Sequence, residues 1–203
     1  MKPKSIEPRV AAVVLAAGKS SRMAGENKLL LPFRGRPLIL HTLAALRDAG
    51  LSQIVVVVGH ERERLRAVLP DRITVVFNRD YEEGMASSIR AGIAALPSQV
   101  EAAFIVQGDM PLLHADILRM LMSRYDSEQA NSIIVPVYRG RQANPVLFPR
   151  AYFPELLQLQ GDTGAKRLLA ERAAVIVPVP MEDPAVVTDI DTPEAYERLQ
   201  RQE

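Results

Sequence analysis

Short runs of apolar, often β-branched residues recur along the chain, separated by stretches of mixed polarity. A continuous apolar run of about four to eight residues is typical of a strand buried on both faces of a parallel sheet. These runs predict strands over residues 10–15, 54–58, 73–77, 102–106, 133–138, 146–148 and 175–179.

The intervening stretches carry apolar residues at helical spacing. They predict helices over residues 38–49, 61–69, 85–96, 114–125 and 192–199, with shorter helices near Leu156 and over residues 164–171. Alternating strands and helices predict an α/β fold with a mostly parallel sheet that helices cover on both faces. Ligands in such folds bind beyond the carboxyl ends of the strands, so the loops at residues 16–27, 59–60, 78–84 and 107–111 are candidate walls of a site.

Length and charge narrow the possible functions. A chain of 203 residues with 48% hydrophobic residues fits one domain over residues 1–203. The 25 Lys and Arg residues nearly balance the 24 Asp and Glu residues, which gives no general attraction to nucleic acid or to an anionic membrane. We therefore expect neither nucleic acid nor a membrane as a partner.

The chain has no cysteine, which excludes disulfides, zinc–thiolate sites, iron–sulfur clusters and a cysteine nucleophile. Residues 1–9 are too polar for a signal peptide, and no apolar run is long enough to span a membrane. We expect a cytoplasmic protein. The three histidines, His41, His60 and His114, are dispersed and show no metal-ligand spacing.

The loop after the first predicted strand combines small residues with cations. Small residues let the backbone approach a ligand, and successive N–H groups can then cradle phosphates. Arg22 and Lys28 add two positive charges to this loop. The residues of the loop that we expect to contact a phosphate-bearing ligand are Leu15, Ala16, Ala17, Gly18, Ser20, Arg22 and Lys28. The Gly-Lys-Ser at residues 18–20 does not end a Walker A loop, because Val13 stands where that motif needs glycine, and the Rossmann spacing of glycines is also missing. For Gly-Lys-Ser alone, an incidental surface turn remains the alternative.

Three aspartates are candidate metal ligands, because Mg²⁺ prefers one or two carboxylates together with substrate phosphates. Asp109 follows the strand at residues 102–106, at the edge where ligands bind. Asp191, or in second place Asp189, is the candidate for a further ligand, and their alternate spacing puts both on the same side of an extended segment. Two alternatives stay open: Asp109 as a cap of the helix near His114, and Asp191 as the cap of the closing helix.

Six segments together resemble the MobA-like nucleotidyltransferases, and within them the MocA-type molybdenum cofactor cytidylyltransferases. Residues 15–38 read LAAGKSSRMAGENKLLLPFRGRPL and resemble the signature L-A-[AG]-G-x-S-x-R-M-G…K-L-L…G-x-P-L. The others are NRDYEEGMASSI at residues 78–89, QGDMP at 107–111, NPVLF at 144–148, GDTGAK at 161–166 and TDIDTPE at 188–194. Ala24 and Ala143 depart from the pattern, since many relatives have glycine there.

The resemblance implies a three-layer αβα, Rossmann-like fold of the GT-A-like kind. It also implies Mg²⁺-dependent transfer of CMP from CTP to the phosphate of the molybdopterin molybdenum cofactor, with pyrophosphate as the leaving group. A molybdoenzyme of the xanthine dehydrogenase type is the implied protein partner. Arg22, Lys28 and Asp109 would be the catalytic residues.

Further site residues follow from the same motifs. Besides the first loop, nucleotide contacts would come from Gly59, Asn78, Ser87 and Gly108. Acceptor contacts would come from Met110, Asn144, Pro145, Asp162, Gly164 and Lys166. A simple capping turn is the alternative for Asp162 and Lys166.

Three other functions stay open. The choice of CTP as the substrate rests mainly on Ala17, because relatives that use GTP tend to carry L-A-G-G. A guanylyl- or other nucleotidyltransferase with another phosphorylated acceptor is therefore one alternative. A MocA-like NAD(P)H-dependent oxidoreductase is disfavoured by the missing Rossmann glycines. A non-catalytic carrier of the molybdenum cofactor would not need the metal–triphosphate residues Arg22, Lys28 and Asp109.

Overall fold

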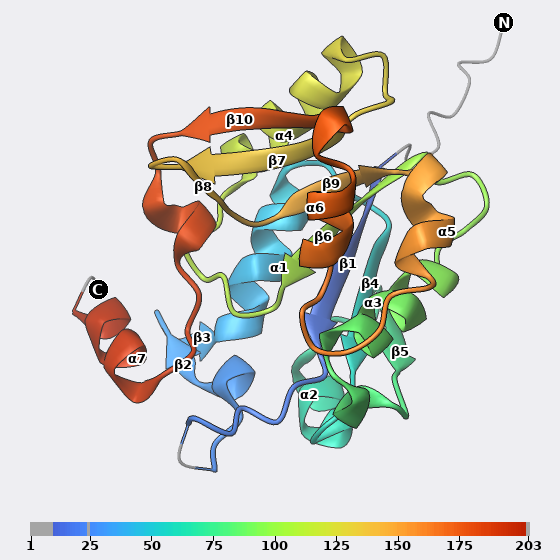
Figure 1. Cartoon of the computed structure of the whole chain (residues 1–203). Helices are drawn as coiled ribbons and strands as arrows, with labels where there is room; N and C mark the ends of the chain where they lie inside the picture. The colour runs from blue at the N-terminus through green and yellow to red at the C-terminus, as the bar shows by residue number, and fades with distance from the viewer. Residues whose placement is uncertain (1–9, 24, 202–203) are drawn as a thin grey trace, which may run out of the picture.

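A computed structural model describes residues 10–23 and 25–201, so the predictions for residues 1–9 and for Ala24 lie outside the described residues. One sheet runs through the molecule in the order β10-β7-β9-β6-β1-β4-β5, with the short β8 paired to β7 (Figure 1). Its strands are β1 (Val10–Ala16), β4 (Ile54–Val58), β5 (Thr74–Phe77), β6 (Ala102–Gln107), β7 (Ile133–Tyr138), β8 (Arg141–Gln142), β9 (Val146–Pro149) and β10 (Ile176–Met181).

Most neighbouring strands of this sheet are parallel, which confirms the predicted fold class. β1 lies between β6 and β4 and is parallel to both, with Ala12 opposite Phe104 on one side and Ile54 on the other. β9 is the exception among the longer strands, since it runs antiparallel to β6 and to β7. The carboxyl ends of β1, β4 and β6 therefore lie at one edge of the sheet.

Helices cover both faces and make three layers (Figure 1). The helices are α1 (Leu38–Asp48), α2 (Arg62–Val68), α3 (Met85–Ala94), α4 (Ala115–Ser127), α5 (Phe153–Leu156), α6 (Lys166–Glu171) and α7 (Pro193–Gln200). Side chains of α1, α2 and α4 pack on one face of the sheet, and those of α3, α5 and α6 pack on the other. The strands are thus buried on both sides, as their continuous apolar runs predict.

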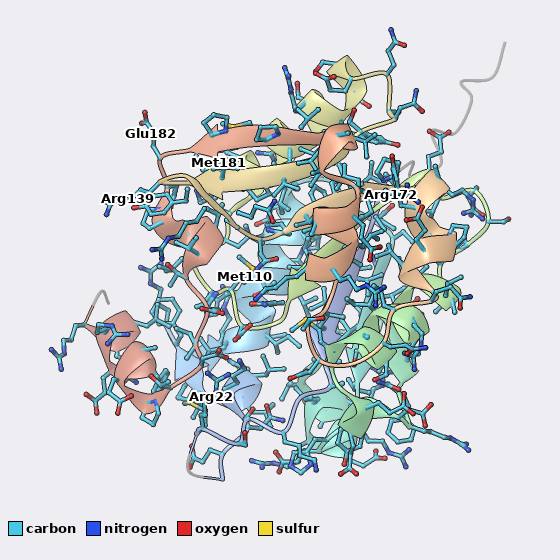
Figure 2. All side chains as sticks on the ribbon, viewed as in Figure 1. Arg22, Met110, Arg139, Arg172, Met181 and Glu182 are labelled. Carbon is cyan, nitrogen blue, oxygen red and sulfur yellow. The ribbon has the colours of Figure 1, made fainter. Side chains whose placement is uncertain are left out.

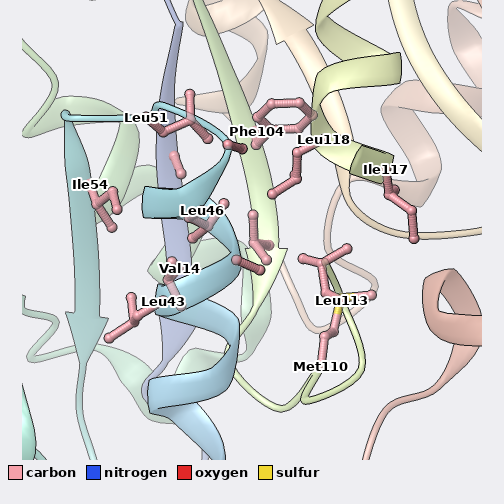
Figure 3. Close-up of a cluster of buried hydrophobic side chains, with 14 of the residues drawn as sticks. Val14, Leu43, Leu46, Leu51, Ile54, Phe104, Met110, Leu113, Ile117 and Leu118 are labelled. Atoms are coloured by element: carbon pink, nitrogen blue, oxygen red, sulfur yellow. The ribbon is translucent and has the colours of Figure 1, made fainter. Parts of the chain in front are cut away.

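The packing between α1, α4 and the sheet is shown in Figure 3. Leu46 and Leu118 are fully buried and belong to the same cluster as Phe104 of β6. Burying a leucine of this kind contributes about 1.5–3 kcal/mol of hydrophobic free energy. This core fixes β6, and with it the loop that begins at Gly108.

A small hairpin and the last helix form a separate cluster beside the sheet. The hairpin strands are β2 (Pro32–Phe33) and β3 (Arg36–Pro37), and Phe33 packs with Ile190 and Leu199 in one apolar cluster. The Tyr196 hydroxyl donates to the Pro32 carbonyl oxygen over 2.6 Å. The C-terminal segment is thereby held next to the first loop, almost the whole length of the chain away in sequence.

The edge strand β10 carries two prolines, Pro178 and Pro180, and both are exposed. Proline has no backbone N–H, and within sheets it is found chiefly at edges. None of the helices in the described part of the chain has the length and apolar character needed to cross a membrane.

Candidate functional site

A cavity of about 540 Å³ opens at the carboxyl ends of β1 and β6. Its walls are the first loop, the segment around residues 81–88, the ends of β1 and β6, and aspartates from three further segments. The lining residues are Leu15, Ala16, Ala17, Gly18, Lys19, Ser20, Ser21, Arg22, Lys28, Leu29, Tyr81, Glu82, Glu83, Gly84, Met85, Ser88, Gln107, Asp109, Asp162, Asp189 and Asp191. This is the edge at which a parallel sheet binds its ligands.

The first loop turns sharply around Ser20 and presents its backbone to the cavity. Ser20 has a φ of 51°, and its carbonyl oxygen accepts a hydrogen bond from Met23 N over 2.8 Å. Its hydroxyl accepts a hydrogen bond from Lys28 N over 3.2 Å, which joins the two ends of the loop. A Cβ on Gly18 would meet only open space within 4 Å, so this glycine borders room for a ligand.

Lys28 extends from the 3₁₀ helix η1 (Lys28–Leu30) towards two carboxylates. Asn27 starts this helix by accepting a hydrogen bond from Leu29 N over 3.1 Å. The ammonium group of Lys28 donates to Asp109 Oδ2 and, over 2.6 Å, to Asp191 Oδ1. Only 20% of the Lys28 side chain and 5% of the Asp109 side chain are exposed, so this contact is largely shielded from water.

Asp109 is positioned by the loop that follows β6. Gly108 N donates to the Leu15 carbonyl oxygen over 3.0 Å, and the Gly108 carbonyl oxygen accepts from the Thr42 hydroxyl over 3.0 Å. The helix α4 has His114 at its N-cap with no side-chain capping bond. The geometry therefore favours Asp109 as a member of the cavity over Asp109 as a helix cap.

The segment at residues 189–191 brings two more carboxylates into the cavity. Ile190 is buried, and its N–H donates to the Asp109 carbonyl oxygen over 3.3 Å, while Asp189 and Asp191 both line the cavity. Asp191 also pairs with Arg22 over 3.0 Å. The cap of α7 is Thr192, whose hydroxyl accepts from Ala195 N over 3.2 Å. Thr192 fills the capping role, and Asp191 contacts the two cations.

The electrostatics of this cluster follow from burial and from the charges within it. Burial lowers the pKa of Lys28, but the neighbouring Asp109 and Asp191 outweigh burial and leave this pKa raised. Burial likewise raises the pKa of Asp191, but Lys28 and Arg22 together bring it below its usual value. The pKa of Asp189 is raised, first by burial and then by repulsion from Asp109 and Asp191. All three aspartates thus lie within electrostatic range of one another.

The opposite wall comes from the 3₁₀ helix η2 (Tyr81–Glu83) and the start of α3. The side chain of Tyr81 packs so closely on Gly59 that a Cβ there would lie 2.6 Å from the tyrosine Cβ. Lys19 from the first loop pairs with Glu82 over 2.6 Å, and both side chains are exposed. Lys19 therefore joins the two walls. The predicted site wall at residues 78–84 thus contributes residues 81–84 to the lining, whereas no spacing in the sequence indicates that Lys19 pairs with Glu82.

Four of the predicted nucleotide contacts lie just behind the cavity lining. Gly59 contacts Tyr81, and Gly108 holds the Asp109 loop as described above. Asn78 is buried and donates from Nδ2 to the hydroxyls of Ser87 and Ser88, over 2.8 and 3.0 Å. Of these two serines only Ser88 lines the cavity. Direct nucleotide contact by Gly59, Asn78, Ser87 and Gly108 stays a prediction, and the structure gives them supporting positions.

Among the predicted acceptor residues, Asp162 is the one that lines the cavity. Its Oδ1 accepts from Met85 N over 3.0 Å, so it caps α3 from a segment 77 residues away. Gly164 packs against Met85, where a Cβ would lie 2.7 Å from the sulfur. Lys166 begins α6. Asp162 therefore caps α3 and not the helix that follows it in sequence, since the N-cap of α6 is Ala165 and makes no side-chain capping bond. Contact of Asp162 with an acceptor stays a prediction.

The other predicted acceptor residues lie deeper or further away. Met110 is 1% exposed and belongs to the core at the centre of the molecule (Figure 2). Asn144 donates its N–H to the Val186 carbonyl oxygen over 3.0 Å, and Pro145 follows it through a cis peptide bond. None of these three is part of the cavity lining, and their contact with an acceptor stays a prediction.

The donor chemistry of the cavity suits a hard divalent cation. Carboxylate oxygens of Asp109 and Asp191 converge on one point, which the Lys28 ammonium group occupies. Among residues 10–23 and 25–201 no group of three or more His, Cys, Asp or Glu side chains is arranged to hold a metal. Two carboxylates completed by substrate phosphates are the ligand set that Mg²⁺ usually takes.

Comparison with known proteins places this geometry in context. Residues 12–175 match the family described as the MobA-like NTP transferase domain. The molybdenum cofactor cytidylyltransferase of Escherichia coli is 30% identical over 186 residues, which cover 91% of this chain and 92% of the relative. The purine catabolism protein PucB of Bacillus subtilis is also 30% identical, over 96% of this chain and 97% of its own.

Solved structures share the fold over nearly the full length. Rv0371c from Mycobacterium tuberculosis superposes with a TM-score of 0.84 at 29% identity, covering 95% of this chain and 98% of that one. A further structure of Rv0371c is a complex with manganese, with a TM-score of 0.79 at 29% identity over 96% of this chain and all of that one. A nucleotidyl transferase from Methanothermobacter thermautotroptrophicus shares the fold with a TM-score of 0.82 at 22% identity, over 97% of this chain and 98% of that one.

Proposed function

This chain belongs to the MobA-like NTP transferase family and is a nucleotidyltransferase, and from that premise we propose that it transfers CMP from CTP to the phosphate of the molybdenum cofactor. The reaction uses Mg²⁺ and releases pyrophosphate. The acceptor phosphate attacks the α-phosphorus of CTP, a new P–O bond forms there, and the bond to the β-phosphate oxygen breaks.

One observation carries this proposal: the cavity brings Arg22 and Lys28 of the first loop together with Asp109 and Asp191. A nucleoside triphosphate with its metal needs cations for the phosphates and carboxylates for the metal, and all four groups lie at one edge of the sheet. The identity of 30% to a molybdenum cofactor cytidylyltransferase over 91% of the chain supports the choice of cytidylyl transfer.

The residues act chiefly by positioning and by electrostatic stabilisation. A phosphate nucleophile is already ionised near neutral pH, so no strong general base is required, and nucleotidyl transfer depends on alignment and on stabilising spread negative charge. Asp109 and Asp191 would hold Mg²⁺, which supplies charge stabilisation at the α-phosphate. Arg22 and Lys28 would stabilise the leaving pyrophosphate.

The backbone of residues 15–18 would form the floor under the nucleotide. Ala17 is 4% exposed. Its carbonyl oxygen lies close to Gly59, which in turn packs against the side chain of Tyr81. In the proposal Ala17 supports CTP over GTP, because relatives that use GTP tend to carry glycine at this position and guanine is the larger base. A molybdoenzyme of the xanthine dehydrogenase type would receive the product, in the cytoplasm.

The proposal is tested by supplying purified molybdenum cofactor and Mg²⁺ with each of the four NTPs in turn. We expect pyrophosphate release to be fastest with CTP and the α-phosphate of CTP to appear in a cofactor dinucleotide. If GTP is the only NTP from which pyrophosphate is released, the assignment changes from cytidylyl transfer to guanylyl transfer. Binding of the cofactor without pyrophosphate release from any NTP would instead favour the carrier function. In a separate assay with added NADPH, oxidation of the NADPH would favour the oxidoreductase.

A further inference from the structure

The ammonium group of Lys28 lies at the point where the carboxylates of Asp109 and Asp191 meet. It donates to both of them, and the contact to Asp191 is 2.6 Å long. The two carboxylates come from segments 81 and 163 residues further along the chain, so only the folded molecule forms this arrangement. Asp109 is almost fully buried, and its charge is balanced here by Lys28.

Lys28 can leave this position without unfolding its own segment. Its backbone is held at the start of η1 by the Ser20 hydroxyl, but its four-carbon side chain has rotatable bonds and a mobile charged end. The neighbouring loop is open to solvent, as the 67% exposed side chain of Arg22 shows. Figure 2 shows Arg22 at the rim of this region, away from the core.

A divalent metal and the Lys28 ammonium group cannot both contact the same carboxylate oxygens. The two are like charges and would repel strongly at contact distance in a site so shielded from water. A metal can therefore gain Asp109 and Asp191 only if Lys28 moves. The phosphate groups of a nucleotide are also negatively charged, and they offer Lys28 alternative partners to the two carboxylates that it leaves.

We propose that Lys28 is an internal counter-cation of Asp109 and Asp191 that keeps the divalent metal out until a nucleoside triphosphate draws it away. The inference rests on the proposed function, because it takes these carboxylates as the metal ligands. Metal and nucleotide then favour one another's binding, since each stabilises the arrangement that the other needs. The carboxylates stay neutralised in the free protein, and the metal arrives together with its substrate.

The experiment measures binding of Mn²⁺ alone, followed by the loss of its free-ion EPR signal, to the nucleotide-free protein. Removing the ammonium group with Lys28→Met should tighten Mn²⁺ binding by about tenfold or more, within the range of ordinary coupling energies. Lys19→Met is the matched control. It removes a lysine from the same loop and the same cavity, but Lys19 pairs with Glu82 and should leave Mn²⁺ binding as in the wild type.

Two further measurements identify the site. After subtraction of the Mn²⁺ that CTP binds in a protein-free series, CTP should tighten Mn²⁺ binding to the wild type far more than to Lys28→Met, because the variant has no Lys28 ammonium group to displace and Arg22 is present in both. The double variant Lys28→Met/Asp109→Asn should lose the gain in Mn²⁺ affinity. Lys28→Gln serves as a second variant if Lys28→Met folds poorly, which circular dichroism would show.

Three results would overturn the inference: unchanged or weaker Mn²⁺ binding by Lys28→Met or Lys28→Gln, an equal gain in Lys19→Met, or a gain that survives Asp109→Asn. Tight binding of Mn²⁺ alone by the wild type would overturn it without any variant. The proposed function fails by a different measurement, which is the absence of pyrophosphate release by the wild type with every NTP.

Discussion

The carboxylate of Asp109 lies buried at the end of β6, opposite a lysine from 81 residues earlier in the chain. Replacing Asp109 by alanine should lower metal-dependent pyrophosphate release by about 100-fold or more, which is the scale of losing one preorganised electrostatic group. The helices and strands should stay intact, and circular dichroism would check this. Normal metal-dependent pyrophosphate release by a folded Asp109→Ala variant would contradict the assignment.

Thr192 and Asp191 are neighbours with different roles, which two substitutions can separate. Thr192→Ala removes the cap of α7 and should reduce the free energy of unfolding by about 0.5–2 kcal/mol while leaving nucleotidyl transfer unchanged. Asp191→Asn should have the opposite profile, with transfer strongly reduced. Urea unfolding and the pyrophosphate assay measure the two effects. An Asp191→Asn variant with full activity would remove Asp191 from the metal site.

At the scale of single residues, the sequence predicts the charged groups of the cavity better than their contacts. Arg22, Lys28, Asp109 and Asp191 were expected from motifs, and all four line the cavity. That Lys28 bridges the two carboxylates could not be predicted, because the contact depends on how distant segments pack. The role of Lys19 was missed for a related reason: its partner Glu82 belongs to another wall of the cavity.

The start of α3 and the segment at residues 161–164 are packed too closely for a side chain at Gly84. This residue has a φ of 104°, and a Cβ would lie 2.8 Å from the Asp162 Cα. Gly84→Ala should therefore cost about 1–3 kcal/mol of backbone strain, to which the clash adds. It should also weaken nucleotide binding, since Gly84 and Met85 line the cavity.

Gly140→Ala is a suitable control for this substitution. Gly140 also has a positive φ, of 76°, but a Cβ there would meet nothing within 4 Å. We expect the control to lose stability from backbone strain alone and to bind CTP like the wild type. Equal unfolding free energies and equal CTP affinities of the two variants would show that the close packing at Gly84 has no effect on the cavity.

Asp183 connects the 3₁₀ helix η5 (Pro184–Val187) to the residue before α4. Its pKa is lowered, first by the hydrogen bond from Ala185 N and then by the His114 ring. A lowered carboxyl pKa contributes stability above its ordinary value of 3.8, and that contribution is lost as the pH falls through the lowered pKa. The difference in melting temperature between the wild type and Asp183→Asn should therefore shrink as the pH falls below about 4. A difference that is constant or grows on acidification would contradict this assignment.

Element by element, the apolar runs predict nearly all of the long strands and helices, with ends within about two residues. The two-residue strands β2, β3 and β8 were missed, because so short a segment contains no period to detect. The antiparallel direction of β9 was also missed. An apolar run indicates that a strand is buried, but it carries no information about which way the strand runs beside its neighbours.

For the molecule as a whole, the choice of nucleotide can be read from stability. A ligand that binds only the folded state raises its stability, by about 2.7 kcal/mol at a concentration one hundred times its Kd. CTP with Mg²⁺ should therefore raise the melting temperature more than GTP with Mg²⁺ at the same concentration. Equal or reversed shifts would remove the assignment to CTP and leave the nucleotidyltransferase assignment in place.

The two prolines of β10 affect the association of one copy of the protein with another. An edge strand with free backbone donors can pair with a strand of a second molecule and so begin an aggregate. Pro178 and Pro180 each remove one such donor from the edge, in a strand of six residues. The sheet is consequently a poor template for extension on that side, which favours a protein that stays dispersed at the high concentrations that calorimetry and EPR require.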